Sequence, residues 1–215
     1  MQFLFDNVDL LVRAFLTTLG LSALAGLLAV VLGTLLAAAR VSPIPPLRGL
    51  ATFYVEVFRN TPLTVVFFFL IFGLPQIDFV IGFFPGAVLS LGLYTAAFVC
   101  EAVRSGINAV SVGQAEAARA VGMTFGQTLR LVVLPQAIRS VIPPLASILI
   151  ALAKNTAIAE AFGLVEATGR MDNLVRDFPT ALYPLFFGTA AGYIVIVLAI
   201  AVIARVLERR LVVLR

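Results

Sequence analysis

Three short polar groups interrupt a chain that is otherwise strongly apolar. One is "AKNTA" at residues 153–157, where an ammonium, an amide and a hydroxyl follow one another within an apolar stretch. Such groups are costly at membrane depth unless they face protein or a water-filled path. A lysine can instead extend its ammonium to the membrane surface. The sequence leaves both readings open for Lys154, Asn155 and Thr156.

A second polar group is "EVFRNTP" at residues 56–62. Glu56 and Arg59 lie one helical turn apart, so they can neutralise each other at or near hydrocarbon. Pro62 has no backbone N–H, and we expect it to bend the helix or to begin its buried part. Asn60 and Thr61 can then satisfy the freed carbonyls. The alternative is an ion pair at a helix end, level with the lipid headgroups.

The third polar group is "EAARAVG" at residues 116–122. Its alanines favour a helix, and Glu116 and Arg119 can pair because they are three residues apart. Gly122 can stop this helix or allow another backbone to approach closely. A short polar helix between apolar segments fits a groove on a partner protein or rests on lipid headgroups, and the residues alone allow both.

Several kinds of chemistry are excluded by composition. The chain has no histidine and one cysteine, which removes a histidine-based catalytic triad and an intrachain disulfide, and we expect no metal site. Cys100 is expected to be a small buried apolar residue. No Gly-Lys pair occurs, so the phosphate-binding loop of ATPases is absent and any ATP must bind to another chain.

The elements that position these groups are membrane-spanning helices. The chain of 215 residues is 61% hydrophobic and 12% charged, against about 45–50% and about 25% in soluble domains. Uncharged runs cover residues 14–39, 60–77, 79–100, 140–153 and 178–204. A span needs about 20 apolar residues, so the second must begin near Gly49 and the fourth must place Lys154 at membrane depth. We predict an all-α membrane protein with five spans, the first retained and not a signal peptide.

The distribution of basic residues predicts the orientation of these spans. One set of connections holds ten arginines, including Arg40, Arg104 and Arg215, and the other holds three alongside acidic residues such as Asp6. Basic residues gather on the cytoplasmic side, which places the N-terminus outside and the C-terminus in the cytoplasm. The net charge of +4 therefore reports orientation, and we expect no nucleic-acid partner.

The third connection, residues 105–139, is too long for a structureless loop. Its alternating charged and apolar positions predict short amphipathic helices punctuated by glycines. The fourth connection, residues 155–178, is expected to form a cap or short helix on the outside.

At this point the motifs resemble a known family. Glu116-Ala117-Ala118, Gly122, Val132 and Leu134-Pro135 match the EAA signature of permease subunits of ATP-binding-cassette importers. The segments "YVEVFRNTPL", "FGLP", "LPQAIRSVIPPL" and "LAKNTAIA" extend this resemblance over residues 50–165, and they are similar to the polar amino acid uptake branch.

This resemblance implies a type I importer permease fold, with residues 1–215 as one transmembrane domain and residues 105–139 as its cytoplasmic loop of coupling helices. The loop would dock on an ATPase subunit through Glu116, Ala117, Ala118, Arg119, Gly122, Leu134 and Pro135. The chain itself would hydrolyse no ATP and hold no cofactor, since ATP and magnesium would bind to the ATPase. Further partners would be a second, homologous but different permease, two ATP-binding subunits, an extracytoplasmic substrate-binding protein and membrane lipid, in a prokaryotic cell membrane.

The segments "FRNTPLT", "GQAEAARAVG" and "AKNTAIAEAFG" look closest to glutamate-type permeases, which implies an acidic amino acid as substrate. We expect the substrate path to involve Arg59, Asn60, Thr61, Lys154, Asn155 and Thr156. Two alternatives come from other classes of protein: a self-contained secondary transporter or channel, and a non-transporting membrane scaffold. A secondary transporter is typically built from two inverted halves, and five spans cannot be divided into equal halves.

Overall fold

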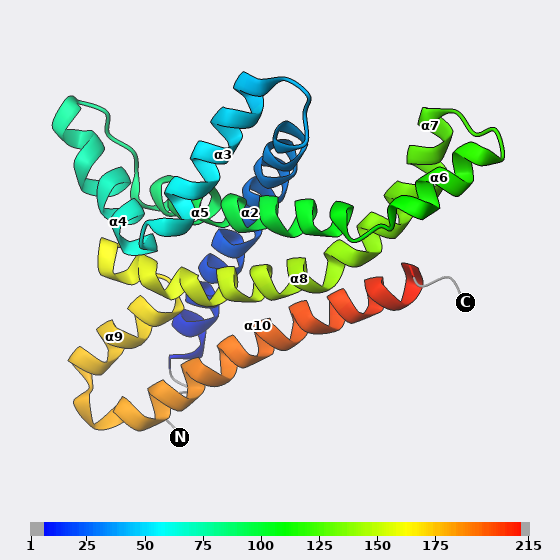
Figure 1. Cartoon of the computed structure of the whole chain (residues 1–215). Coiled ribbons are helices and arrows are strands. Elements are labelled where there is room, and N and C mark those ends of the chain that lie inside the picture. Colours follow the sequence, from blue (N-terminus) through cyan, green and yellow to red (C-terminus); the bar gives the residue numbers. More distant parts are fainter. Residues whose placement is uncertain (1–6, 212–215) are drawn as a thin grey trace.

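The computed structural model describes residues 7–211 (Figure 1). The terminal residues used in the charge count, Asp6 and Arg215, lie outside this range. Within it the chain is helical and has no β-strand. The α-helices are α2 (Val8–Arg40), α3 (Pro45–Asn60), α4 (Leu63–Phe68), α5 (Phe83–Asn108), α6 (Val112–Ala120), α7 (Phe125–Thr128), α8 (Leu134–Asn155), α9 (Ala167–Asp177) and α10 (Leu182–Leu211).

Shorter turns extend these helices. Two are π-helical, η1 (Phe69–Gly73) and η3 (Leu129–Val133), and three are 3-10 turns, η2 (Leu74–Ile77), η4 (Thr156–Phe162) and η5 (Pro179–Ala181). Four helical stretches of the described chain are long and apolar enough to cross a membrane by themselves, and they are Val8–Arg40, Phe83–Asn108, Phe125–Phe162 and Pro179–Arg210. The fifth span exists only if α3 and the stretch Leu63–Ile77 are counted together.

The second span is therefore a broken helix, and of the two outcomes expected for Pro62 the bend is the one that forms. Its two parts meet at an angle of 105°. Thr61, the residue before Pro62, is extended with φ −99° and ψ 131°, as expected because a proline disfavours the helical conformation in the preceding residue. The Asn60 amide and the Thr61 hydroxyl donate to the carbonyls of Glu56 and Val57, both at 2.8 Å. Their predicted role at the bend is confirmed.

Helix α2 packs along α5 through small residues. A Cβ built on Gly33 would lie 2.6 Å from the Val99 Cβ and 2.7 Å from the Ala96 carbonyl oxygen, so the two backbones approach more closely than a side chain allows. Small residues at such crossings are typical of membrane helices, whose association depends on close van der Waals packing. This contact fixes the central pair of the bundle.

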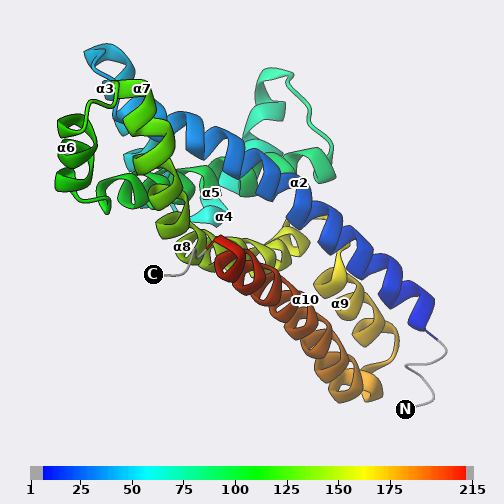
Figure 2. The same ribbon diagram turned by 90° about the vertical axis from the view of Figure 1, so that its right-hand side faces the viewer.

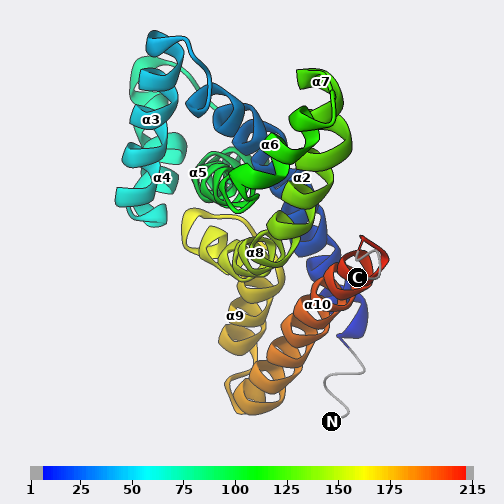
Figure 3. The ribbon, with the colours of Figure 1, turned by 45° about the vertical axis from the view of Figure 1, so that its right-hand side comes forward.

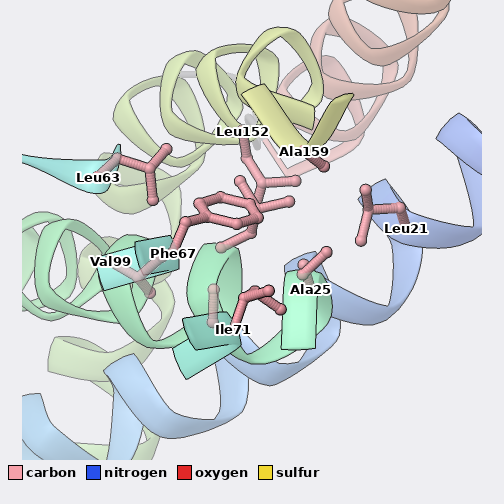
Figure 4. Close-up of a cluster of buried hydrophobic side chains, with 11 residues drawn as sticks. Leu21, Ala25, Leu63, Phe67, Ile71, Val99, Leu152 and Ala159 are labelled. Carbon is pink, nitrogen blue, oxygen red and sulfur yellow. The ribbon is translucent and has the colours of Figure 1, made fainter. Parts of the chain in front are cut away.

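The main core lies where α4 meets this central pair. Phe67 is fully buried there, in a cluster with Leu21, Val99 and Leu152 from α2, α5 and α8 (Figure 4). Its ring stacks on Phe162 with centroids 5.0 Å apart. The core thus anchors the second half of the broken span against the rest of the bundle. Cys100 is buried in a neighbouring cluster on α5, which confirms its predicted environment.

The two ends of the bundle differ. At one end α6 and α7 project away from the long helices, on the side toward which α10 ends; at the other, α9 lies beside the start of α2 (Figure 2). The start of α2 and the end of α10 thus lie at opposite ends, as an odd number of spans requires. Within residues 105–139, α6 is a separate short helix, whereas α7 and η3 continue directly into α8 and form the first turns of the fourth span.

Candidate functional site

The turn after α6 is built around Gly122. This residue has φ +87°, in the left-handed region that favours glycine, and a Cβ built on it would meet nothing within 4 Å. The Met123 N–H donates to the Ala118 carbonyl and the Gly122 N–H to the Arg119 carbonyl, at 3.1 and 3.0 Å, which is a Schellman motif. Gly122 therefore ends the helix, and close approach of another backbone does not explain it.

The next helix begins immediately with a capping box. The Thr124 hydroxyl accepts from the Gln127 N–H at 3.3 Å, and the Gln127 side-chain oxygen accepts from the Thr124 N–H at 2.9 Å. Four residues thus separate α6 from α7, and both helix ends at this turn are capped by local hydrogen bonds. The turn holds α6 at a set angle to the fourth span. Pro135, another of the predicted coupling residues, lies in this span, in the first turn of α8.

Most of the predicted coupling residues lie on the surface of α6 and its turn. Ala118 is the buried residue of α6, a helix that packs against α7 and η3. Three large apolar side chains face outward, with Val112 at the start of α6 70% exposed and Val121 and Phe125 at the turn 79% and 77% exposed. The coupling residues that are exposed are Glu116, Ala117, Arg119, Gly122 and Leu134, whereas Pro135 is half-buried.

The predicted ion pair between Glu116 and Arg119 does not form among the described residues. The Arg119 Nε instead donates to the Ala115 carbonyl at 3.4 Å, and the Glu116 carboxylate stays in the open. Both charges are therefore available on the outer face of α6, beside the exposed apolar side chains. A surface of this kind can bury an apolar centre and pair charges at its rim when a protein binds.

A cluster of four charges joins α2, α3 and α5. Glu101 pairs with Arg40, and its Oε2 accepts from the Arg104 Nη2 at 2.8 Å. The Arg59 Nη1 lies 3.6 Å from its Oε1, and the Arg59 guanidinium carbon lies 6.0 Å from the centroid of the Phe98 ring. Glu101 is thus the shared counter-charge of three arginines. We refer to Arg40, Arg59, Glu101 and Arg104 as the Glu101 cluster.

This cluster corrects one sequence prediction. Arg59 does not pair with Glu56, because Glu56 lies on the exposed side of α3 and its Oε2 accepts from the Asn60 amide at 3.3 Å instead. Glu101 and Arg104 pair along α5, three residues apart. The contribution of Arg40 was missed, and no local signal reveals it, because 61 positions separate it from Glu101.

Replacing Glu101 with glutamine is expected to destabilise the bundle by about 1–3 kcal/mol, between the values for exposed and buried ion pairs. Its side chain is 20% exposed, and three guanidiniums would lose their counter-charge. The matched control is Asp172→Asn, which breaks the exposed pair of Asp172 with Arg176 on α9. Thermal unfolding in detergent should show a clear fall in melting temperature for Glu101→Gln and almost none for Asp172→Asn. Equal falls in the two variants would contradict this role of the cluster.

Lys154 lines a cavity formed by residues of α8, η4, α9 and α10. Helix α9 and the start of α10 lie at the end of the bundle away from α6 and α7 (Figure 3). The cavity has a volume of about 250 Å³, roughly eight times the ~30 Å³ that a water molecule occupies in the liquid. Among residues 7–211, no carboxylate forms an ion pair with the Lys154 ammonium. The cavity is lined by Lys154, Ala157, Thr168, Met171, Phe186, Thr189, Ala190 and Tyr193.

The other predicted path residues lie elsewhere. Thr156 is fully buried, and its hydroxyl donates to the Ala153 carbonyl at 2.7 Å, while Asn155 is half-buried and does not line the cavity. Arg59 and its neighbours lie at the bend of the second span. The structure therefore separates the six predicted path residues into three at the bend, Lys154 at the cavity, and Asn155 and Thr156 outside both.

A buried carboxylate next to this cavity was missed by sequence reasoning. Glu166 is fully buried and caps α9, where its Oε1 accepts from the N–H groups of Thr168 and Gly169 at 2.8 and 3.1 Å. Its Oε2 accepts from the hydroxyls of Thr18 and Tyr193 at 3.1 and 2.6 Å. An ionised carboxylate can only accept hydrogen bonds, and here every partner is a donor. The sequence offered one indication of this role: Glu166 stands just before a short helix, where an acidic side chain is typical of an N-cap.

Comparisons with known proteins agree with this geometry. Residues 13–213 match the family model described as "Binding-protein-dependent transport system inner membrane component". The chain is 42% identical over 200 residues to the glutamate transport system permease protein GluC of Corynebacterium glutamicum, covering 87% of this chain and 88% of that protein. It is 36% identical to the probable glutamine ABC transporter permease protein GlnM of Bacillus subtilis, covering 97% and 96%.

The fold is also similar to a solved structure. The crystal structure of an amino acid ABC transporter with histidines contains a chain that superposes with a TM-score of 0.89 at 33% identity, covering 96% of both chains. The overall arrangement of helices is thus one already seen in a transporter.

Proposed function

Because this chain belongs to the family of inner membrane components of binding-protein-dependent transport systems, we propose that it carries glutamate or another acidic amino acid through an ATP-driven importer. The chain is a multi-pass permease of the cell membrane in the polar amino acid branch of ABC transporters. It is not an enzyme, since a separate ATPase chain of the transporter hydrolyses ATP.

The family implies a partner permease, an ATPase and a substrate-binding protein. We propose that the partner permease is a homologous but different chain, and that two ATPase subunits bind at the α6 end of the bundle. Support comes from the exposed apolar side chains around Gly122, beside the open charges of Glu116 and Arg119. In the same proposal the N-terminus lies outside and the C-terminus in the cytoplasm, because the arginine-rich connections all lie toward the α6 end.

The single observation that carries the substrate proposal is the 42% identity with a glutamate permease over most of both chains. The Lys154 ammonium adds physical support, because it lines a cavity and forms no ion pair among the described residues. A carboxylate of the substrate would supply the missing counter-charge. A glutamine permease is also similar at 36% identity, so charge selectivity is the property to measure.

The residues of the proposed substrate path form two parts, an outer and an inner one. Lys154 forms the outer part at the cavity, next to Asn155 and Thr156 in the chain, whereas Arg59, Asn60 and Thr61 form the inner part at the bend of the second span. Arg59 is 42% exposed and is the member of the Glu101 cluster farthest from the shared carboxylate, so its charge is the least neutralised. A partner permease would line the opposite side of both parts of the path.

Transport then needs only that ATP favours one arrangement of the permease pair over the other. ATP binding to the ATPase subunits would do so if α6 transmits their movement to the spans. The rigid turn at Gly122 and the continuous helix from α7 into α8 connect α6 to Lys154 through a single helical stretch. No covalent chemistry is required of this chain.

The experiment that tests the substrate is a competition assay. The permease pair, ATPase and binding protein are reconstituted in liposomes, and uptake of labelled glutamate is measured against unlabelled aspartate, glutamine, histidine and arginine. We expect glutamate and aspartate to compete and the neutral and basic amino acids to compete weakly. Stronger competition by glutamine or arginine would refute the acidic substrate while leaving the family assignment intact.

Lys154→Ala is expected to reduce glutamate uptake about tenfold, because one charge-assisted hydrogen bond to the substrate would be lost. Assembly with the ATPase should not change, since Lys154 lies at the end of the bundle away from α6. Lys154→Arg is the matched control, which keeps the charge and should retain most of the uptake. Unaltered uptake in Lys154→Ala would remove Lys154 from the path.

A further inference from the structure

Helix α10 is the least buried of the four spans that a single helical stretch forms. Only 6% of its apolar stretch is buried, against 56% in α5. Its first turns pack closely, since Leu185 is fully buried and a Cβ built on Gly192 would clash with the Phe15 ring of α2. Beyond Gly192, cavities separate α10 from the helices beside it.

Two adjacent cavities lie along the face of α10 that is turned toward α2 and α8. The larger has a volume of about 610 Å³ and borders α10 from Val195 to Ile203. The smaller has a volume of about 280 Å³, lies between α8 and α10, and extends to Leu207. Leu149, Ile200 and Ile203 line both. We refer to the two cavities together as the α10 cleft.

The walls of the α10 cleft are apolar. Ser22 is the one lining residue with a polar side chain, and its hydroxyl donates to the Thr18 carbonyl at 2.8 Å. An apolar cavity of even ~150 Å³ stays free of water and takes up an apolar ligand. Leu27 and Ile203 in the walls are 64% and 60% exposed, so the cleft opens sideways toward the hydrocarbon of the membrane. Its occupant must therefore be apolar.

The α10 cleft is also long and narrow. From Val195 to Leu207 it extends about 18 Å at ~1.5 Å per residue, close to the ~15 Å that one leaflet contributes to a hydrocarbon core of ~30 Å. A helix with its side chains is about 10–12 Å wide, so one turn of it fills roughly 500 Å³. The larger cavity borders more than two turns of α10 with about 610 Å³. It is too narrow for a helix of another chain, and an extended acyl chain fits it.

One end of the cleft is positively charged. Arg139 precedes the lining residue Ile142 by three positions on α8, and Arg210 follows Leu207 by three positions on α10, so each arginine continues a lining face. The two helices run in opposite directions, which places both arginines at the same end (Figure 1). Within the described part of the chain neither forms an ion pair, and Glu208, two positions from Arg210, lies on another face.

From the apolar cleft and the two arginines at its end we infer a binding site for an anionic phospholipid. One acyl chain lies in the α10 cleft, and the headgroup phosphate pairs with Arg139 and Arg210. The planar guanidinium of arginine binds phosphate oxygens in pairs, which favours such a headgroup. In the proposed orientation this end lies in the cytoplasmic leaflet, which carries anionic lipids. The lipid supplies packing that α10 lacks within the chain.

The test measures the lipid that the purified transporter complex retains. The complex is equilibrated in detergent with equal amounts of dioleoyl phosphatidylglycerol and dioleoyl phosphatidylcholine, which have the same acyl chains and differ in headgroup charge. Bound lipid is counted by native mass spectrometry. We expect retention of phosphatidylglycerol to exceed that of phosphatidylcholine about tenfold.

Removing both arginines tests the headgroup site. In Arg139→Gln combined with Arg210→Gln, the preference for phosphatidylglycerol should fall to about twofold or less. The matched control combines Arg205→Gln with Arg209→Gln. It removes the same charge from exposed positions on the face of α10 turned away from the cleft, and it should keep the preference.

Filling the cleft tests the acyl chain. Ala204 lines the smaller cavity, and the ring in Ala204→Phe would occupy the space of the chain, so retention of both lipids should fall at least about threefold. Val202→Phe is the control, because Val202 is 59% exposed and does not line the cleft. If Ala204→Phe fails to fold, thermal unfolding of the unmodified complex decides the matter, since phosphatidylglycerol should raise its melting temperature and phosphatidylcholine should not.

The inference is overturned if phosphatidylglycerol is not preferred, if the two pairs of arginine variants lose the preference equally, or if Ala204→Phe retains as much lipid as Val202→Phe. Loss of the partner permease from the Ala204→Phe complex, with lipid retention unchanged, would show that a helix of the partner fills the cleft instead. None of these outcomes involves transport, so failure of the proposed acidic substrate would not affect them.

Discussion

Gly122→Val is expected to abolish uptake while the helix bundle stays folded. Gly122 has φ +87°, and a non-glycine residue in the left-handed region costs about 1–2 kcal/mol, more for a β-branched side chain. No atom lies within 4 Å of a Cβ at this position, so the strain is confined to the turn. The turn would open, α6 would lose its angle to the fourth span, and ATP hydrolysis would no longer drive the permease.

The matched control for this prediction is Gly126→Val, four residues further along. Gly126 has no positive φ and also has nothing within 4 Å of a built Cβ, so the same side chain is added without the same backbone strain. Uptake and ATPase activity stimulated by the loaded binding protein should be lost in Gly122→Val and largely retained in Gly126→Val. Full stimulated activity and uptake in Gly122→Val would refute the coupling role of this turn.

Gly33→Ala is expected to have a large effect on stability. The added Cβ would lie 2.7 Å from the Ala96 carbonyl oxygen, which belongs to the backbone and cannot move aside as a side-chain end can. Overpacking of this kind costs about 1–3 kcal/mol, which corresponds to a fall in melting temperature of roughly 2–12 °C for a chain of this size. Thermal unfolding of the purified permease in detergent measures it.

Gly20→Ala on the same helix is the control, because the nearest atom to its Cβ would be the Phe84 Cζ at 4.0 Å, an ordinary contact. It should unfold within about 2 °C of the unmodified protein, since a single surface-like change rarely exceeds ~0.5 kcal/mol. If the two variants unfold at the same temperature, the close crossing of α2 and α5 does not stabilise the bundle.

The spans and the coupling turn were predictable because they depend on local sequence. An apolar run long enough to cross a membrane can be recognised from the sequence alone. Gly122 favours a helix end whatever the helix packs against. The bend at Pro62 was one of two predicted outcomes for that proline. What local sequence could not decide was the angle, because 105° depends on Phe67 and its neighbours packing the second half of the span into the core.

The site was harder to predict because its parts come from distant segments. Glu101 meets Arg40 across 61 positions, and Glu166 meets Thr18 across 148. The i, i+3 rule suggested the pairs of Glu56 with Arg59 and Glu116 with Arg119, and neither forms among the described residues, since spacing along one helix says nothing about the charges that a neighbouring helix supplies. Lys154 was visible as a cation at membrane depth, but Tyr193 and Thr189, which share its cavity, looked like ordinary residues of an apolar span.

The central claim is that this chain moves an acidic amino acid only when a separate ATPase drives it. The most direct measurement is accumulation of labelled glutamate in proteoliposomes that contain the permease pair and the ATPase, with the binding protein outside and ATP trapped within. We predict accumulation above the external concentration with ATP, and none with a non-hydrolysable analogue. Equilibration of glutamate without ATP would instead indicate a secondary transporter or channel, and no movement of any amino acid under either condition would indicate a scaffold.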